Sequence, residues 1–266
     1  MAILSQFLLR LAFGLAVGMA ITPPSKVFSG FYRNHLYVTL GLTTLAALLL
    51  ASIYMPAAAC AGLAAGLSFL AAATWLYEAK RAGVVLIQLV AICSLLAALM
   101  AASIVKHDYS QPTAGGTEEI VIVAGTHLTA LRAVSIATSG LALGITIACM
   151  FLGHWHLNAP GMELEPLRRL ISAAAVAVLL QMIVAGAGFA LEVSHRASLP
   201  FDWLLFVALR WLFGLLGVLG LLWMAWQTLK IPNTQSATGI LYVAVIGVFV
   251  GELTGLLLSA QSAYPL

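Results

Sequence analysis

Charged residues are scarce in this sequence. Its 266 residues include 12 Lys and Arg and 9 Asp and Glu, so only 8% of the chain is charged and 62% is hydrophobic. Soluble domains carry about 25% charged residues. The composition therefore excludes an ordinary soluble globular domain, and a chain this apolar cannot stay disordered in water either. The net charge is only +3 and no basic run occurs, so we expect no nucleic-acid partner.

Cysteines and familiar catalytic motifs are also few or missing. The three cysteines, Cys60, Cys93 and Cys149, lie in apolar stretches and are too few for a disulfide framework, so we interpret them as free buried thiols. No Cys-x-x-Cys-His motif occurs, which excludes covalently attached haem. The sequence also lacks a phosphate-binding P-loop, a His-Glu-x-x-His zinc motif and a Gly-x-Ser-x-Gly nucleophile motif.

Long apolar runs dominate what remains, and the mean hydropathy is +1.06. A helix needs about 20 mostly apolar residues to cross a bilayer. The runs are continuous and show no alternation, so they indicate helices and not a membrane barrel. We predict one all-α integral membrane domain over 1–266, a polytopic bundle of eight spans. The spans are expected at roughly 2–21, 35–54, 57–79, 82–104, 128–157, 167–193, 203–229 and 237–260.

The first apolar run is interpreted as a retained helix, because Arg10 lies inside it and no polar mature domain follows. Two small-residue pairs, Gly14 with Gly18 and Gly62 with Gly66, have the spacing of close helix contacts. The spans divide into two sets of four around one sizeable loop, 105–127. The two sets could form a parallel duplication, although their sequences show no convincing match.

Basic residues in the short loops predict the orientation. One side of the predicted topology carries seven of them: Lys26, Arg33, Lys80, Arg81, Arg168, Arg169 and Lys230. The other side, which holds both termini and loop 105–127, carries Lys106, Arg132 and Arg196. The excess places the first set inside, in what we expect to be a bacterial plasma membrane, with both termini and the loop outside. Within the loop, residues 119–124 could form a short strand or lie on the membrane surface.

Four polar side chains fall inside spans: Arg10, Gln181, Arg210 and Glu252. A charge at the bilayer centre costs at least about 2.5–3.5 kcal/mol, so such residues need a reason to be there. At about 1.5 Å per residue all four lie roughly 10–16 Å from the outer surface, in one layer. One interpretation is a buried Arg210–Glu252 pair that locks the last two spans together. The other is a polar site for a quinone head group, or a proton path, in which the carboxylate exchanges protons with quinol.

The histidines sort by membrane face. His35, at the start of the second span, and His154, near the end of the fifth, lie on the inner side; His127 and His195 lie on the outer side. Two imidazoles from facing helices are the usual ligands of non-covalent haem b. His35 with His154 would hold one haem iron, and His127 with His195 a second. The alternative is that these are ordinary interfacial histidines.

The general arrangement, eight spans with histidines at their ends and one buried carboxylate, resembles membrane anchor subunits of respiratory complexes. Our leading hypothesis is an integral membrane electron-transfer subunit that binds quinol and haem b and acts with other membrane or peripheral subunits. A small-solute or ion transporter with Glu252 as the coupling carboxylate is the second hypothesis. A non-catalytic structural or assembly subunit, whose buried charges only hold helices together, is the third.

Overall fold

A computed structural model describes residues 1–103, 110–112, 118–120, 126–159, 161–196 and 198–266, and the side chains of all of these except 110–112, 118–120 and 126–129. Eight helices in this part of the chain are long and apolar enough to cross a membrane. The predicted all-α multi-span bundle is confirmed. The helices before the large loop are α1 (Ala2–Ile21), α2 (Ser29–Ala51), α3 (Met55–Leu76) and α4 (Lys80–Ala102).

The second set of spans follows the loop. It comprises α5 (Thr126–Asn158), α6 (Glu165–His195), a compound helix and α9 (Thr234–Ala260). The compound helix runs without a break from α7 (Phe201–Leu209) through a π-helical stretch, η1 (Arg210–Gly217), into α8 (Val218–Thr228). Two three-residue strands, β1 (Ser110–Pro112) and β2 (Glu118–Ile120), pair antiparallel in the loop. The remaining loop residues, including His107, lie outside the described residues.

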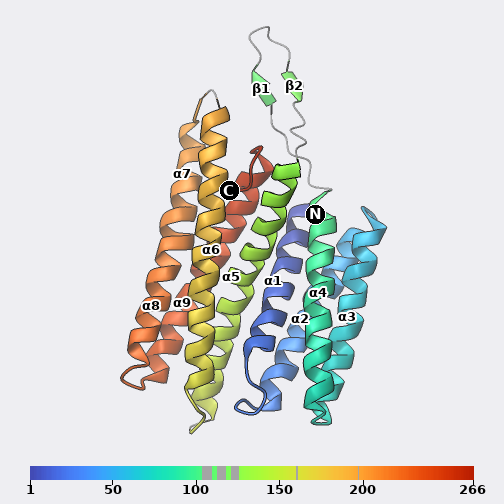
Figure 1. The fold of residues 1–266 in the computed structure, drawn as a ribbon, viewed down its shortest axis with the longest axis vertical. Helices are drawn as coiled ribbons and strands as arrows, with labels where there is room; N and C mark the ends of the chain where they lie inside the picture. The colour runs from blue at the N-terminus through green and yellow to red at the C-terminus, as the bar shows by residue number, and fades with distance from the viewer. Residues whose placement is uncertain (104–109, 113–117, 121–125, 160, 197) are drawn as a thin grey trace.

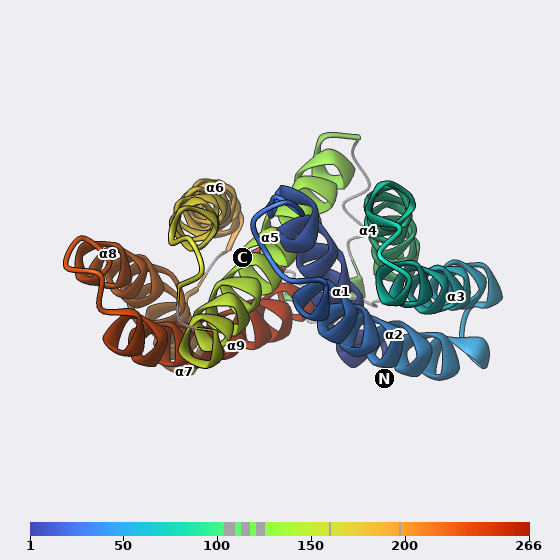
Figure 2. The ribbon, with the colours of Figure 1, turned by 90° about the horizontal axis from the view of Figure 1, so that it is seen from below.

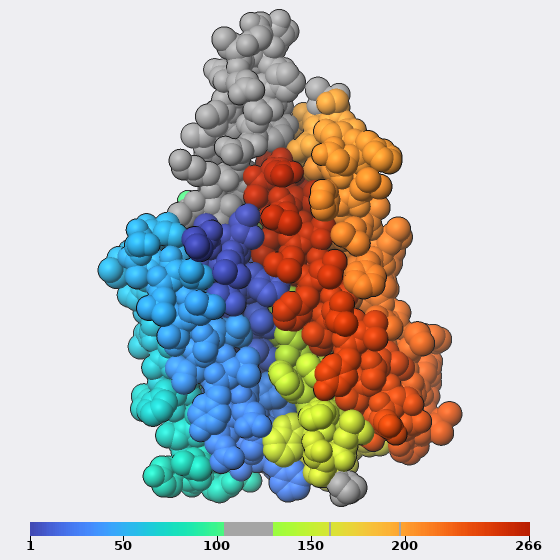
Figure 3. Space-filling view, turned by 180° about the vertical axis from the view of Figure 1, so that it is seen from behind, coloured from blue at the N-terminus to red at the C-terminus, as the bar shows by residue number. Residues whose placement is uncertain are grey.

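Each set of four spans closes on itself. In the first set α1 packs against both α2 and α4, and α3 joins those two helices on the far side. In the second set α5 packs against both α6 and α9, and the compound helix joins those two. Figure 2 shows the two sets side by side with α1 and α5 between them. Figure 3 shows the same division on the surface, blue to cyan against orange to red.

Both chain termini lie at one end of the bundle, which we call the terminal end; the connections after α1, α3, α5 and α8 lie at the opposite end (Figure 1). This arrangement follows from an even number of spans. Large apolar side chains cover the outside of the bundle, and Leu48, Ile183 and Leu212 are each about two-thirds exposed. Such a surface is what a bilayer covers, so the chain is a multi-pass membrane protein in contact with lipid.

Glycines form the contact between the two sets. A Cβ atom on Gly14 of α1 would lie 1.8 Å from the carbonyl oxygen of Gly140, and one on Gly144 of α5 would lie 2.3 Å from the Cα atom of Gly14. A Cβ on Gly18 would meet the Ala148 methyl at 2.8 Å. In lipid the hydrophobic effect does not drive helices together, so this close approach supplies the packing that joins the sets.

The Gly14 and Gly18 pair thus makes the close contact expected of it. The expectation for Gly62 and Gly66 is wrong, because no other helix comes within 4 Å of a Cβ built at either position. The spacing alone could not separate the two cases, since a pair of small residues can equally face lipid. What distinguishes the Gly14 pair is a matching pair, Gly140 and Gly144, on another span.

This contrast predicts the effect of added methyl groups. Gly144→Ala forces α1 and α5 apart and should destabilise the protein by about 1–3 kcal/mol, the usual cost of overpacking. Gly62→Ala meets nothing and removes a flexible residue from a helix interior, which should be neutral or stabilising by up to about 1 kcal/mol. Unfolding of both variants in detergent, followed by circular dichroism, measures the difference. Equal stability of the two variants would contradict the glycine contact.

Candidate functional site

Arg210 and Glu252 face each other inside the second set of helices. Arg210 begins the π-helical stretch η1 and Glu252 lies on α9, and each is only 2% exposed. The Arg210 Nη2 and Glu252 Oε1 atoms are 3.8 Å apart, and Arg210 Nη1 donates a hydrogen bond to the Gly251 carbonyl at 3.2 Å. The structure therefore brings together the two charges that the sequence analysis placed in one layer.

Small residues on α9 make room for this arginine. A Cβ on Gly255 would overlap the Arg210 guanidinium, and one on Gly251 would lie 2.5 Å from the Cα of Gly214. With Gly247, these glycines form a series spaced by four residues along one face of α9. This four-residue spacing is a signal for a close helix contact that the sequence already carries and that the prediction of packing from Gly14, Gly18, Gly62 and Gly66 missed.

The carboxylate of Glu252 also connects to the first set of helices. Its Oε2 accepts a hydrogen bond from Ser139 Oγ of α5 at 2.5 Å, and the same Ser139 oxygen accepts one from Arg10 Nη1 of α1 at 3.2 Å. Arg10 Nε in turn donates to Gln6 Oε1 at 3.4 Å, and Gln6 Nε2 donates to the Ala98 carbonyl of α4 at 2.6 Å. One polar chain, which we call the relay, thus joins Gln6, Arg10, Ser139, Glu252 and Arg210.

Gln181 belongs to a neighbouring interaction and not to the relay. Its Oε1 pairs with the hydroxyl of Thr138, the residue before Ser139, and the side chain is 1% exposed. No hydrogen-bond partner for its Nε2 is found among the residues that the structure describes. Of the four polar residues expected in one layer, the relay links Arg10, Arg210 and Glu252. Gln181 lies beside the relay, paired with Thr138.

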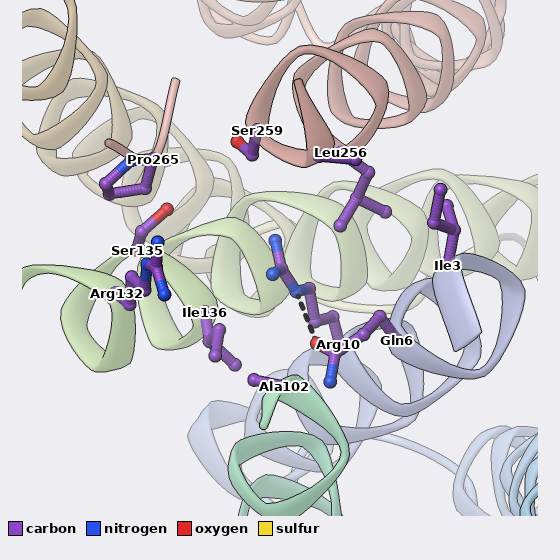
Figure 4. Close-up of a pocket in the computed structure, with 11 residues that line it drawn as sticks. Ile3, Gln6, Arg10, Ala102, Arg132, Ser135, Ile136, Leu256, Ser259 and Pro265 are labelled. Carbon is purple, nitrogen blue, oxygen red and sulfur yellow. Dashed lines mark hydrogen bonds between the residues drawn. The ribbon is translucent and has the colours of Figure 1, made fainter. Parts of the chain in front are cut away.

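A small pocket leads from the terminal end of the bundle to Arg10. Its volume is about 50 Å³, and α1, α4, α5 and α9 all contribute to its walls. Figure 4 shows its polar side chains, among them Gln6, Arg10, Arg132 and Ser135. Gln181, Arg210 and Glu252 do not line it, so Arg10 is the one member of the expected quinone set that a ligand in this pocket would touch.

The last residues of the chain form part of the same pocket. Glu192 of α6, 1% exposed, accepts hydrogen bonds from the backbone amides of Ala263 and Tyr264 at 3.0 and 3.2 Å. Arg132 Nη2 donates to the Ala263 carbonyl at 2.9 Å. These bonds fold residues 261–266 back onto the bundle and place Pro265 in the pocket wall. From the sequence Arg132 was interpreted only as a topology signal, and this role was missed.

His35 lies in a different place, at the opposite end of the bundle. The expected start of the second span at residue 35 is wrong, because α2 begins at Ser29 and the aromatic residues Phe31 and Tyr32 are already buried within it. His35 is consequently inside the helix and 2% exposed. Its ring packs on Phe31 at 4.1 Å and edge-on against Phe151 of α5 at 5.0 Å, measured between ring centroids.

The hydrogen bonds of His35 define its chemistry. Its Nδ1 lies 2.7 Å from the Phe31 carbonyl, an acceptor, so Nδ1 carries the hydrogen and donates it. In the neutral ring Nε2 then keeps its lone pair. Nε2 is buried and has no hydrogen-bond partner in the described part of the chain. A hydrogen bond from one ring nitrogen to a carbonyl oxygen is a usual way in which proteins orient the other ring nitrogen toward a metal.

His154 lines the same pocket as His35. This pocket has a volume of about 440 Å³ and lies between α2 and α5, with Phe151 and Trp155 in its walls. His154 is exposed, and its Nδ1 is 3.4 Å from the Tyr242 hydroxyl, a long and weak contact. The structure thus brings the expected inner pair, His35 and His154, to one cavity of the size that cofactors occupy.

The other histidines are placed differently. The side chain of His127 lies outside the described residues, and the expected outer pair of His127 and His195 therefore stays a prediction. His195 ends α6, with its ring 5.4 Å from that of Tyr264. Both ring nitrogens of His156 face backbone carbonyls, of Leu152 at 2.8 Å and Glu163 at 3.0 Å, so neither nitrogen is directed at an open metal position. No group of three or more His, Cys, Asp or Glu side chains that could hold a metal occurs among the described residues.

An exposed ion-pair cluster joins the two sets at the opposite end. Lys26, between α1 and α2, lies 2.9 Å from Glu163, which precedes α6, and 3.3 Å from Glu165, the first residue of α6. Hydrogen bonds to these carboxylates raise the pKa of Lys26 above its usual value. Exposed pairs of this kind are screened by solvent and contribute little stability, so the glycine contact between α1 and α5 remains the main connection.

Comparisons with known protein families, with curated proteins and with solved structures return no match. Functional conclusions for this chain therefore depend on its own residues.

The relay predicts a coupled response to mutation. Arg210→Leu leaves the buried Glu252 carboxylate with Arg10 as the only guanidinium in the relay. Removal of one partner from a buried ion pair costs about 3–5 kcal/mol. Each single substitution breaks the same Arg210–Glu252 contact, so the double variant, Arg210→Leu with Glu252→Gln, should lose less than the sum of the two single losses. Denaturant unfolding of the two single variants and the double variant measures the coupling. Additive losses would show that the two side chains do not stabilise each other.

Proposed function

We propose that the protein is an integral membrane electron-transfer subunit that holds haem b in the pocket of His35 and His154. The single observation that carries this proposal is the buried, unpartnered Nε2 of His35 at the wall of a pocket that a second histidine also lines. A buried nitrogen lone pair without a partner is costly in a protein interior. An iron ligated by that nitrogen would remove the cost.

The pocket fits such a group in size and in chemistry. At about 440 Å³ it lies within the range of cofactor pockets, and its aromatic walls, Phe151 and Trp155, suit a flat conjugated ring. His35 and His154 would hold the iron, and bound haem b would supply one-electron chemistry. The Phe31 carbonyl fixes the ring of His35, while Asn34 and Asn158 offer polar groups at the rim.

Quinol is the electron donor in this proposal, because it dissolves in the bilayer that surrounds the helices. The site expected for its head group needs revision. Gln181, Arg210 and Glu252 are each at least 98% buried and line none of the pockets described above, so they do not meet a ligand directly. Partner subunits, which the electron transfer would require, belong to the same proposal.

The haem site predicts a visible spectrum. Protein purified in detergent, after expression with added haem, should show the sharp reduced-minus-oxidised bands of low-spin haem. His35→Ala should remove most of this signal, because it deletes the one oriented ligand nitrogen, and His154→Ala should remove or broaden it. His107→Ala, a histidine of the loop between α4 and α5, is the matched control and should keep the full spectrum.

A flat spectrum from folded protein would contradict the haem proposal. Retention of the bands in both His35→Ala and His154→Ala would contradict the assignment of the ligands. In the first case transport coupled to Glu252 becomes the better hypothesis, since the relay connects this carboxylate through Ser139 to Arg10 at the terminal-end pocket.

A further inference from the structure

The pocket at the terminal end contains an excess of positive charge. Arg10 and Arg132 both line it, and no acidic residue does so among the described residues. The hydrogen bonds of Arg10 go to neutral atoms, Gln6 Oε1 and Ser139 Oγ. The nearest acid in the relay is Glu252, and it is already paired with Arg210.

A count of charges along the relay makes the imbalance explicit. Arg10 and Arg210 contribute two positive charges and Glu252 one negative charge, so one positive charge remains when all three are ionised. Arg132 adds a further charge at the pocket, where its Nη2 binds the Ala263 carbonyl and its buried Nε has no hydrogen-bond partner in the described structure. Unbalanced charge within the apolar part of a membrane protein is costly, and a bound anion would offset it.

The size of the pocket restricts the ligand. A volume of about 50 Å³ holds a few water molecules, since about 10–15 Å³ of such volume suffices for one. That space fits a compact oxyanion and is too small for a substituted aromatic ring. Guanidinium groups match the oxygens of carboxylates and phosphates by paired hydrogen bonds. The Ser135 and Gln6 side chains supply further polar atoms.

We propose that this pocket binds an acidic oxyanion group, a phosphate or a carboxylate, between Arg10 and Arg132. The group is supplied either by the head group of an anionic lipid or by a free anion. This inference depends on the terminal-end pocket alone and is independent of the haem proposal, whose residues lie at the opposite end of the bundle.

The test is thermal unfolding of the full chain in a detergent of uncharged head group. Inorganic phosphate is titrated against chloride at constant ionic strength, and in separate samples phosphatidylglycerol is compared with phosphatidylcholine. We expect phosphate, phosphatidylglycerol or both to raise the unfolding temperature. Protection by phosphatidylglycerol alone would identify a lipid head group, and protection by inorganic phosphate would identify a free anion.

Arginine variants locate the effect. Arg132→Gln should weaken the apparent affinity for the protecting anion at least tenfold, and Arg132→Lys, which keeps the charge, should weaken it less. Arg169→Gln removes an exposed arginine at the opposite end and should leave the affinity unchanged. Glu192→Gln weakens the hydrogen bonds that hold residues 261–266 but keeps Arg10 and Arg132. Comparison of this variant with Arg132→Gln therefore separates the effect of lost charge from the effect of releasing the chain end.

Two results would overturn the proposal. One is the absence of protection by either anion source in the unmodified protein. The other is protection that persists unchanged in Arg132→Gln, which would place the anion elsewhere. An uncharged quinone analogue that protects the protein through Arg10, when phosphate and phosphatidylglycerol do not, would assign the pocket to a quinone instead.

Discussion

The contact between the Arg210 guanidinium, the backbone of α9 and the Glu252 carboxylate is the interaction on which the interior of this bundle depends. A membrane offers no water to a buried charge, so oppositely charged and polar groups within the protein are what stabilise it. Gly255 allows the guanidinium to lie against α9, and Ser139 extends the contact to α5 and on to Arg10. The positions of α9, α5 and α1 are thereby linked through polar atoms as well as through packing.

Glycine contacts and polar contacts coincide along α5. Gly140 and Gly144 admit Gly14 of α1, and the serine that binds both Arg10 and Glu252 precedes Gly140 directly. Close backbone approach shortens the distance that the side chains must span, so a serine reaches partners on two helices. This is why a short hydroxyl can join an arginine of the first set to a carboxylate of the second.

The sequence was sufficient to predict the features that depend on a single helix. Apolar length predicted all eight spans, and counting residues from the span ends placed Arg10, Arg210 and Glu252 at one depth. Features that depend on two helices were not predictable in this way. Which glycine pair meets a partner, which residues surround His35, and the part that Ser139 and Arg132 play all depend on how the helices are rotated about their axes. Periodicity is weak in helices that are apolar on every face, so the rotation is not encoded in a simple pattern.

Both candidate sites involve α5, which lies where the two sets of helices meet. Ser139 of the relay and His154 of the histidine pocket between α2 and α5 are fifteen residues apart on it, about 22 Å at 1.5 Å per residue. The small cationic pocket and the large histidine pocket therefore lie near opposite ends of one helix, with the bilayer-spanning core between them. Arg10 is linked to Glu252 through hydrogen bonds to Ser139 of α5, whereas His35 contacts α5 through the ring of Phe151. The two sites have separate polar contacts, and α5 is the helix that contributes residues to both.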